Sequence, residues 1–150
     1  MEMFSKILDI KGFKVIQVET DDTALKLSLK CEGNQAKCPY CGIPSQQVHV
    51  WYPRRVRDLP ISGKACYLEF ETRYFDCAAC QTTFAEPLNF VESKRNYTRR
   101  YETSIFEQVR HTTAKYVAER ERLTDKVVTR IFLRQAKQRL PKQPFTGVKR

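Results

Sequence analysis

The chain begins with two runs in which apolar and polar residues alternate. Residues 13–20 and 24–31 are therefore predicted to form strands, joined by a turn at Asp21-Asp22. Three leucines in the second run alternate with lysine and serine, so one face of that strand is apolar. Before these strands, apolar residues recur at helical spacing and predict a short helix that runs to Lys11 and ends at Gly12.

Two later runs, residues 46–52 and 64–76, predict an antiparallel strand pair. The segment between them, residues 53–63, contains two prolines and a glycine and is predicted to be a connecting loop. Cys66 falls on the apolar face of the second run, as Cys31 does on the apolar face of the earlier strand. We expect both thiols to be buried and unreactive.

The pattern becomes helical after residue 94, and neither glycine nor proline occurs before Pro141. Thr98 is a candidate N-cap of a first helix, Thr112 or Thr113 of a second that ends near residue 120, and Thr124 of a third that ends near residue 138. The second and third helices fit a helix-turn-helix template. Two positions depart from it, because Arg122 stands where glycine is common and Glu121 stands where an apolar residue is expected.

Four of the six cysteines form two Cys-x-x-Cys pairs, Cys38 with Cys41 and Cys77 with Cys80. This spacing lets a tight turn direct two sulfurs at one zinc ion about 2.3 Å away. Four thiolates leave no open position for water on the metal, so we predict one structural Zn²⁺ with no catalytic role. The strand pair lies between the two cysteine pairs, and the predicted arrangement is therefore a zinc ribbon.

We also expect the metal to be a condition of folding. An isolated two-stranded sheet is only marginally stable in water. Structural zinc contributes an apparent binding free energy of about 10–16 kcal/mol in small domains.

The sequence also allows roles other than zinc binding for these four cysteines. Cys38-Pro39-Tyr40-Cys41 is also the pattern of a glutaredoxin-like redox dithiol, in which the first cysteine begins a helix that lowers its pKa. Here Gly42-Ile43-Pro44 follows, which does not favour a helix. Disulfides or unpaired thiols are the remaining alternative, although six cysteines in a reducing compartment favour metal binding.

Positive charge is concentrated in the last part of the chain. Residues 94–150 hold 16 Lys/Arg and 5 Asp/Glu, whereas residues 1–93 hold 11 and 12, within a total net charge of +10. Such segregation suggests a polyanionic partner, with nucleic acid ahead of a membrane surface or an acidic protein. No apolar run approaches the roughly 20 residues that span a bilayer, and the N-terminus lacks a signal-peptide pattern. We expect a cytoplasmic, nucleoid-associated protein.

The third predicted helix carries polar and basic residues at spacings of three and four, opposite its apolar face. We predict that it is the recognition helix of a double-stranded DNA-binding protein, with further arginines gripping the backbone. The candidate recognition residues are Lys126, Thr129, Arg130, Arg134 and Lys137. The candidate supporting residues are Arg99, Arg100, Arg54, Arg55 and Arg57. The alternative is an RNA-binding or protein-scaffold zinc ribbon that relies on residues 51–57.

The order of these features resembles the N-terminal part of ISL3-family bacterial transposases. The resemblance covers about residues 7–142, and the string from the arginine-rich segment through the second cysteine pair is its most specific part. The matching residues are Cys38-Pro39-Tyr40-Cys41-Gly42, Val48-His49, Arg55-Val56-Arg57-Asp58-Leu59-Pro60-Ile61-Ser62-Gly63, Tyr74-Phe75-Asp76-Cys77, Thr83-Phe84-Ala85-Glu86, and the helix-turn-helix up to Leu140-Pro141-Lys142.

The resemblance implies a zinc ribbon and a helix-turn-helix that recognises the inverted repeats of an insertion sequence. It also implies a following RNase H-like catalytic domain with acidic metal ligands. The given sequence ends about where that domain's first aspartate would be approached, so we assign no catalytic residue and expect a DNA-binding protein without transposase activity. Its partners would be DNA and either a second copy of the chain or a full-length transposase.

The sequence thus predicts an α+β fold in three parts. Residues 1–92 form a β-rich zinc-ribbon domain with four cysteine ligands, residues 93–142 form an all-α helix-turn-helix bundle, and residues 143–150 form a flexible tail.

Overall fold

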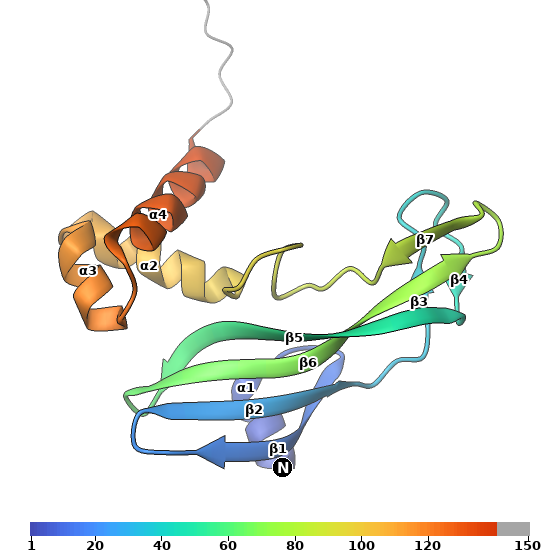
Figure 1. The fold of residues 1–150 in the computed structure, drawn as a ribbon, viewed down its shortest axis with the longest axis horizontal. Coiled ribbons are helices and arrows are strands. Elements are labelled where there is room, and N and C mark those ends of the chain that lie inside the picture. Colours follow the sequence, from blue (N-terminus) through green and yellow to red (C-terminus); the bar gives the residue numbers. More distant parts are fainter. Residues whose placement is uncertain (141–150) are drawn as a thin grey trace, which may run out of the picture. The chain divides into compact units, whose positions relative to one another are not determined.

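The computed structural model describes residues 1–140 and divides into two compact units, Met1–Arg99 and the residues from Arg100 onward (Figure 1). The fold is α+β, as predicted, with the strands in the first unit and helices α2 to α4 following them. The predicted tail, and residues 141–142 of the predicted helical bundle, lie outside the described residues. No helix among residues 1–140 has both the length and the apolar character needed to cross a bilayer.

A five-stranded sheet forms the first unit. Strands β1 (Phe13–Thr20) and β2 (Ala24–Cys31) are an antiparallel pair, and both begin and end where the alternation predicts. β2 pairs in parallel with β6 (Lys64–Cys77), and β6 pairs along its length with antiparallel β5 (Val48–Ile61). The short strand β7 (Thr82–Ala85) adds to the far end of β6 (Figure 1). β6 is therefore the central strand, and it ends at Cys77.

Strand β5 corrects the predicted loop over residues 53–63. The strand continues through Pro53 and Pro60, and only Ser62 and Gly63 turn the chain into β6. Proline cannot donate a ladder hydrogen bond, but an edge strand tolerates it, and β5 lies at one edge of the sheet. Both turn residues have positive φ angles, 52° for Ser62 and 77° for Gly63, which suits a two-residue hairpin turn.

A hydrophobic core covers one face of the sheet. It combines alternate residues of β2 and β6 with Val15 of β1, Val56 of β5, Leu8 of helix α1 (Glu2–Leu8), Ile10 and Val91. The buried members are Leu8, Ile10, Val15, Leu25, Leu27, Leu29, Val56, Cys66, Leu68, Phe70 and Val91. α1 ends earlier than predicted, because Asp9 takes up a left-handed conformation with φ 52°.

The sheet corrects one premise of the predicted metal dependence, namely that the ribbon is an isolated two-stranded sheet. The expectation that folding requires metal stays a prediction. β5 and β6 belong to the five-stranded sheet, and Val56, Cys66, Leu68 and Phe70 contribute to its main core rather than to the cluster at the cysteines. Independent stability of a sheet requires at least three strands with a hydrophobic face, and this sheet meets that requirement. A metal would therefore stabilise chiefly the end of the sheet that carries the cysteines.

Three helices follow the strands in sequence and match the predicted pattern, and all of their residues except Arg99, which begins the first of them, belong to the second unit. They are α2 (Arg99–His111), α3 (Ala114–Glu121) and α4 (Asp125–Arg139). Thr113 caps α3 by accepting a hydrogen bond from the Tyr116 backbone N–H at 3.1 Å, and Thr124 caps α4 through Val127 at 3.2 Å. The Thr98 hydroxyl, next to the start of α2, donates to the Asp58 carboxylate at 2.7 Å, and its role as the N-cap of α2 stays a prediction.

Both departures from the helix-turn-helix template have a physical explanation. Arg122 adopts the left-handed conformation that glycine usually supplies, with φ 56°. Glu121 is buried, and its carboxylate accepts hydrogen bonds from the Tyr101 hydroxyl at 2.9 Å and the Gln108 amide at 3.2 Å. The polar residue is thus tolerated where an apolar one is usual, because α2 supplies its partners.

Candidate metal centre and nucleic-acid interface

The two cysteine pairs sit in the turns of two hairpins. Cys38 and Cys41 lie in the turn between β3 (Ala36–Lys37) and β4 (Pro44–Ser45). Cys77 ends β6, and Cys80 lies in the turn that leads to β7. In the first turn the Gly42 N–H donates to the Cys38 carbonyl at 2.8 Å, and the Cys38 N–H donates to the Ile43 carbonyl at 3.1 Å.

The residue after each pair has a left-handed backbone, which closes the turn. Gly42 has φ 76°, which glycine adopts without strain. Gln81 stands at the equivalent place in the second turn with φ 54°. The second turn therefore adopts the same backbone conformation at this position without the help of a glycine.

The four sulfurs form one compact cluster, with all of them within 4.8 Å of one another. The Sγ atoms of Cys38 and Cys80 are 3.9 Å apart, and those of Cys41 and Cys77 are 3.6 Å apart. Ligands about 2.3 Å from a central ion at tetrahedral angles would be separated by about 3.8 Å. The cluster can therefore hold one zinc ion, as the spacing predicts, and a redox dithiol would need only one of the two pairs.

The thiols do not ionise equally in the absence of a cation. Burial opposes ionisation of Cys38, but hydrogen bonds from the Tyr40 and Cys41 backbone N–H groups outweigh it and lower the pKa of Cys38 to about 7. The contact with the Cys41 sulfur, together with burial, raises the pKa of Cys80 to about 12. A bound dication would allow all four groups to be thiolates at neutral pH, because a coordinating thiol is deprotonated outright.

A small apolar cluster supports the cysteine hairpins from behind. Its buried members are Ala36, Cys38, Phe75, Cys77 and Phe84, and the rings of Phe75 and Phe84 stack with centroids 5.9 Å apart. His49 does not join the sulfurs, since its ring contacts the Asp76 carboxylate at 3.2 Å and is exposed to solvent. The histidine is therefore a strand residue, as predicted, and no fifth ligand.

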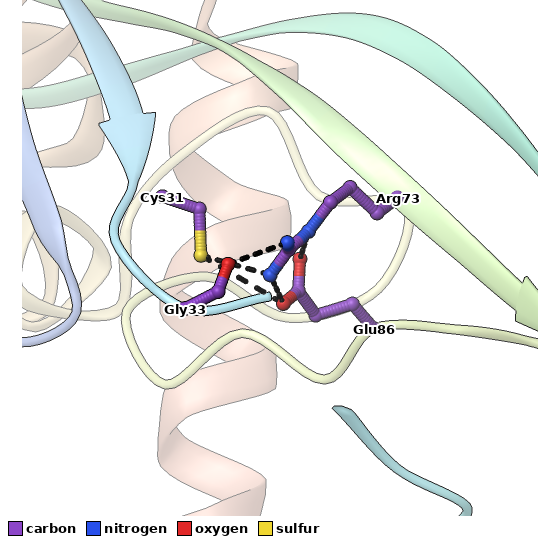
Figure 2. A network of polar contacts seen from close by, with 4 residues as sticks. All are labelled: Cys31, Gly33, Arg73 and Glu86. Carbon is purple, nitrogen blue, oxygen red and sulfur yellow. Dashed lines mark hydrogen bonds and ion pairs between the residues drawn. The ribbon is translucent and has the colours of Figure 1, made fainter. Parts of the chain in front are cut away.

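A buried ion pair connects three segments next to this cluster (Figure 2). The Arg73 guanidinium of β6 bonds to both oxygens of Glu86, to the Gly33 carbonyl at 2.7 Å and to the Cys31 sulfur at 3.0 Å. The side chains of Arg73 and Glu86 are only 5% and 10% exposed. The hydrogen bond to Glu86 raises the pKa of Arg73, so the guanidinium stays charged at every physiological pH.

The sequence pattern did not single out this network. Arg73 lies between Thr72 and Tyr74 in the strand, and nothing in this local pattern marks its charge as buried. The buried face of β6 changes sides at this point. Even-numbered residues are buried up to Thr72, and odd-numbered residues are buried from Arg73 onward. Cys66 is fully buried, as predicted, whereas Cys31 is only partly buried and contacts Arg73.

On α4 the candidate recognition residues do not all share one environment. The side chains of Lys126, Thr129, Arg130 and Lys137 are exposed. The Arg134 side chain is 23% exposed and forms an ion pair with Glu102 of α2, whose side chain is 2% exposed. Arg134 therefore has a structural partner within the helical unit.

The candidate supporting arginines of the first unit also have intramolecular partners. Arg54 donates to the backbone carbonyls of Glu92 at 2.9 Å and Arg95 at 2.6 Å. Arg57 is buried, and its backbone pairs with residues 96–98. Arg55 lies 4.1 Å above the Tyr67 ring. Arg99 is exposed and Arg100 is half-buried. All ten DNA-contact assignments stay predictions at this point.

The comparisons with known proteins match two successive segments of the chain. Residues 34–80 match the model described as the zinc-finger of transposase IS204/IS1001/IS1096/IS1165. Residues 86–136 match the model described as the helix-turn-helix domain of transposase family ISL3. No curated protein and no solved structure matches the chain.

The matched segments coincide with the features described above. The first contains β3 to β6 and all four clustered cysteines, and the second contains α2 and α3 and most of α4. Together they indicate a role in DNA binding. The chain therefore matches, in two successive segments, the zinc-finger and helix-turn-helix models of this group of transposases.

Proposed function

We propose that this chain binds double-stranded DNA with sequence preference, and that α4 is the recognition helix. The observation that carries the proposal is a continuous exposed stripe on α4 that combines basic, hydroxyl and apolar groups. Its members are Lys126, Thr129, Arg130, Leu133 and Lys137. A helix with such a face fits the major groove, where arginine pairs with guanine edges and lysine binds phosphates.

The packing of α4 supports this assignment. Its opposite face is held against the other helices by Val128 and Ile131, and Phe132 stacks on Phe106 with centroids 5.2 Å apart. Since Arg134 pairs with Glu102, we assign it a positioning role that fixes α4 on α2. Arg130 is then the stripe residue best suited to bidentate base contact, because it is the one arginine among the five members and is exposed.

We further propose that the zinc ion orders the cysteine hairpins and that the target is the inverted repeat at the ends of an insertion sequence. The family match supports the target, since it assigns the helix-turn-helix to transposases. The cysteine geometry supports the metal. Arg54 and Arg57 act within the first unit by holding residues 92–98 along the edge of β5, which makes them supports of the fold rather than phosphate contacts.

A titration of the zinc-loaded chain against an inverted-repeat duplex and a scrambled duplex, at about 0.15 M salt, tests the proposal. We expect Arg130→Ala to reduce the preference for the repeat by about 1–3 kcal/mol, the range for one bidentate base contact. Arg110→Ala is the matched control. It removes an exposed arginine of α2 that pairs with Glu107 and lies off the stripe, so it should leave the preference unchanged.

Equal affinity of the wild-type chain for the two duplexes would contradict sequence recognition. Charge reversal at Arg130 separates the proposal from an RNA-binding or scaffold zinc ribbon. That alternative depends on residues 51–57, so it predicts little loss of nucleic-acid binding when α4 is changed.

A further inference from the structure

The first unit contains a groove that neither the cysteine cluster nor the stripe on α4 uses. It has a volume of about 560 Å³ and lies over the face of β5 and β6 that carries Tyr52, Thr72 and Tyr74. Residues 85–94 form its other wall, and Arg99 lines it as well. Since all of these residues belong to the first unit, the groove is a property of that unit alone.

The groove presents exposed aromatic surface. Tyr52 is 53% exposed, although a tyrosine in a sheet usually buries most of its ring against neighbours. It meets Tyr74 edge to face, with ring centroids 5.3 Å apart and an interplanar angle of 86°. This contact fixes the Tyr52 ring while leaving ring surface accessible, which is the arrangement that a planar ligand needs for stacking.

The groove also carries more positive than negative charge. Its two carboxylates have cationic partners, because Glu86 pairs with Arg73 and Glu92 pairs with Arg95 at 3.5 Å. Arg54 is held by two backbone carbonyls, and burial lowers its pKa, as expected for a cation that has lost water to neutral acceptors.

Two more cations, Lys94 and Arg99, line the groove with exposed side chains. Lys94 has a positive φ of 61°, a conformation that a residue with a side chain adopts at a cost and that often marks a functional site.

We propose that this groove binds an unpaired nucleotide of a DNA strand, with the base stacked on Tyr52 and the adjoining phosphates bound by Lys94 and Arg99. Aromatic platforms next to a basic groove bind single strands because every base has a face on which to stack. A base within a duplex has both faces covered by its neighbours, so it cannot make this contact. The site therefore adds to the proposed duplex recognition and does not depend on the stripe of α4.

Fluorescence anisotropy on the zinc-loaded full chain tests the groove with three DNAs. They are a blunt duplex, the same duplex with a single-stranded extension of about six nucleotides at the 3′ or 5′ end, and the extension alone. We expect one of the extensions to raise affinity on the order of tenfold, since one stacked base contributes that much. 2-Aminopurine placed in that extension should lose fluorescence on binding, because stacking on an aromatic ring quenches it.

Tyr52→Ala should remove most of the gain and the quenching, while Tyr52→Phe should retain both. Trp51→Ala is the matched control, because Trp51 is the neighbouring residue on the opposite face of β5 and is 50% exposed. This control should keep the gain. The gain in affinity from the extension should depend less on salt in Lys94→Ala. The slope of log affinity against log salt concentration should fall by about 1, the value for one phosphate contact. Zinc content and melting temperature of each variant establish that it is folded.

Several results would overturn the groove as a site for unpaired DNA. One is that neither extension raises the affinity. Another is that Tyr52→Ala and Trp51→Ala reduce the gain in affinity equally. A third is that Tyr52→Ala lowers the affinity for the blunt duplex as much as the affinity for the extended duplex. A ribonucleotide extension that binds more tightly than the deoxyribonucleotide one would overturn the assignment to DNA. Failure of the proposed recognition helix is distinguishable, because Arg130→Ala would then leave duplex preference intact while the gain from the extension persisted.

Discussion

The cysteine-bearing end of the sheet and the helical unit keep their shapes by different means. Behind the sulfurs lie only five buried apolar residues, two of which are candidate zinc ligands themselves. The helical unit buries Tyr101, Ile105, Val117, Val128 and Ile131 almost completely and caps α3 and α4 with threonines. A small region with little buried apolar surface depends strongly on a metal. The three helices instead share an apolar core, to which the Arg134–Glu102 ion pair adds.

The largest contrast should appear when zinc is removed. We expect chelation, or Cys80→Ser, to abolish amide protection over residues 36–45 and 76–85 while the helices keep theirs. The reason is that zinc binding holds the two hairpins together, and structural zinc contributes a binding free energy on the order of 10 kcal/mol in isolated domains. Hydrogen exchange measured by mass spectrometry, together with zinc content, checks this.

Cys31→Ser is the control, because Cys31 lies outside the sulfur cluster and its loss should leave zinc bound. Acidification should release the ion as chelation does, since protons compete with zinc for the thiolates. Zinc affinity should therefore fall as the pH falls. If the helices lost protection together with the hairpins, the two regions would not be independent.

The next largest effect concerns the buried ion pair between Arg73 and Glu86 in the first unit. Arg73→Met leaves the Glu86 carboxylate buried without a partner and should lower the free energy of unfolding by about 3–5 kcal/mol. The double variant with Glu86→Leu should recover part of that loss, because no charge then remains unpaired. Urea denaturation of the zinc-loaded chain measures both values.

Arg110→Met provides the surface comparison for that experiment. Its pair with Glu107 is about half exposed on both sides, so its removal should cost under about 1 kcal/mol. A loss as large as that of Arg73→Met would mean that burial does not explain the importance of the ion pair.

A buried polar contact in the helical unit should have a smaller effect. Glu121→Leu removes a carboxylate that accepts hydrogen bonds from the Tyr101 hydroxyl and the Gln108 amide, and it should destabilise the unit by about 1–3 kcal/mol. Glu121→Gln retains an acceptor and should cost less. Thermal unfolding followed by circular dichroism at 222 nm gives the comparison. If Glu121→Leu left the stability unchanged or raised it, the hydrogen bonds of Glu121 would contribute no more to stability than an apolar side chain at the same place.

The smallest expected effect is a gain in stability at the turn between α3 and α4. Arg122→Gly relieves the left-handed conformation of a residue with a side chain and should stabilise the helical unit by about 0.5–1 kcal/mol. Arg120→Gly, two residues earlier and within α3, should instead destabilise it by about 1 kcal/mol. The same thermal measurement distinguishes them, and a loss of stability in Arg122→Gly would contradict the turn geometry.

Much of the chain could be predicted because its signals are local. The alternation of apolar and polar residues predicted the exact bounds of β1 and β2. Candidate threonine caps predicted where α3 and α4 begin, and the Cys-x-x-Cys spacing predicted the sulfur cluster. The strands, the caps and the turn within each cysteine pair depend on backbone geometry within a few residues, whereas the meeting of the two pairs depends on the long hairpin between them. The loop predicted for residues 53–63 was wrong because proline usually breaks a strand, and only the position of β5 at the sheet edge permits it.

What the sequence alone determined is the order of elements, the metal ligand set and the basic character of the last helices. Only the tertiary structure decided which charges are used within the fold. It paired Arg73 with Glu86 and Arg134 with Glu102, used Arg54 to hold a distant loop, and left Tyr52 exposed over a groove. The physical reason is that the environment of a side chain depends on segments far away in the sequence, and those segments meet only when the chain folds.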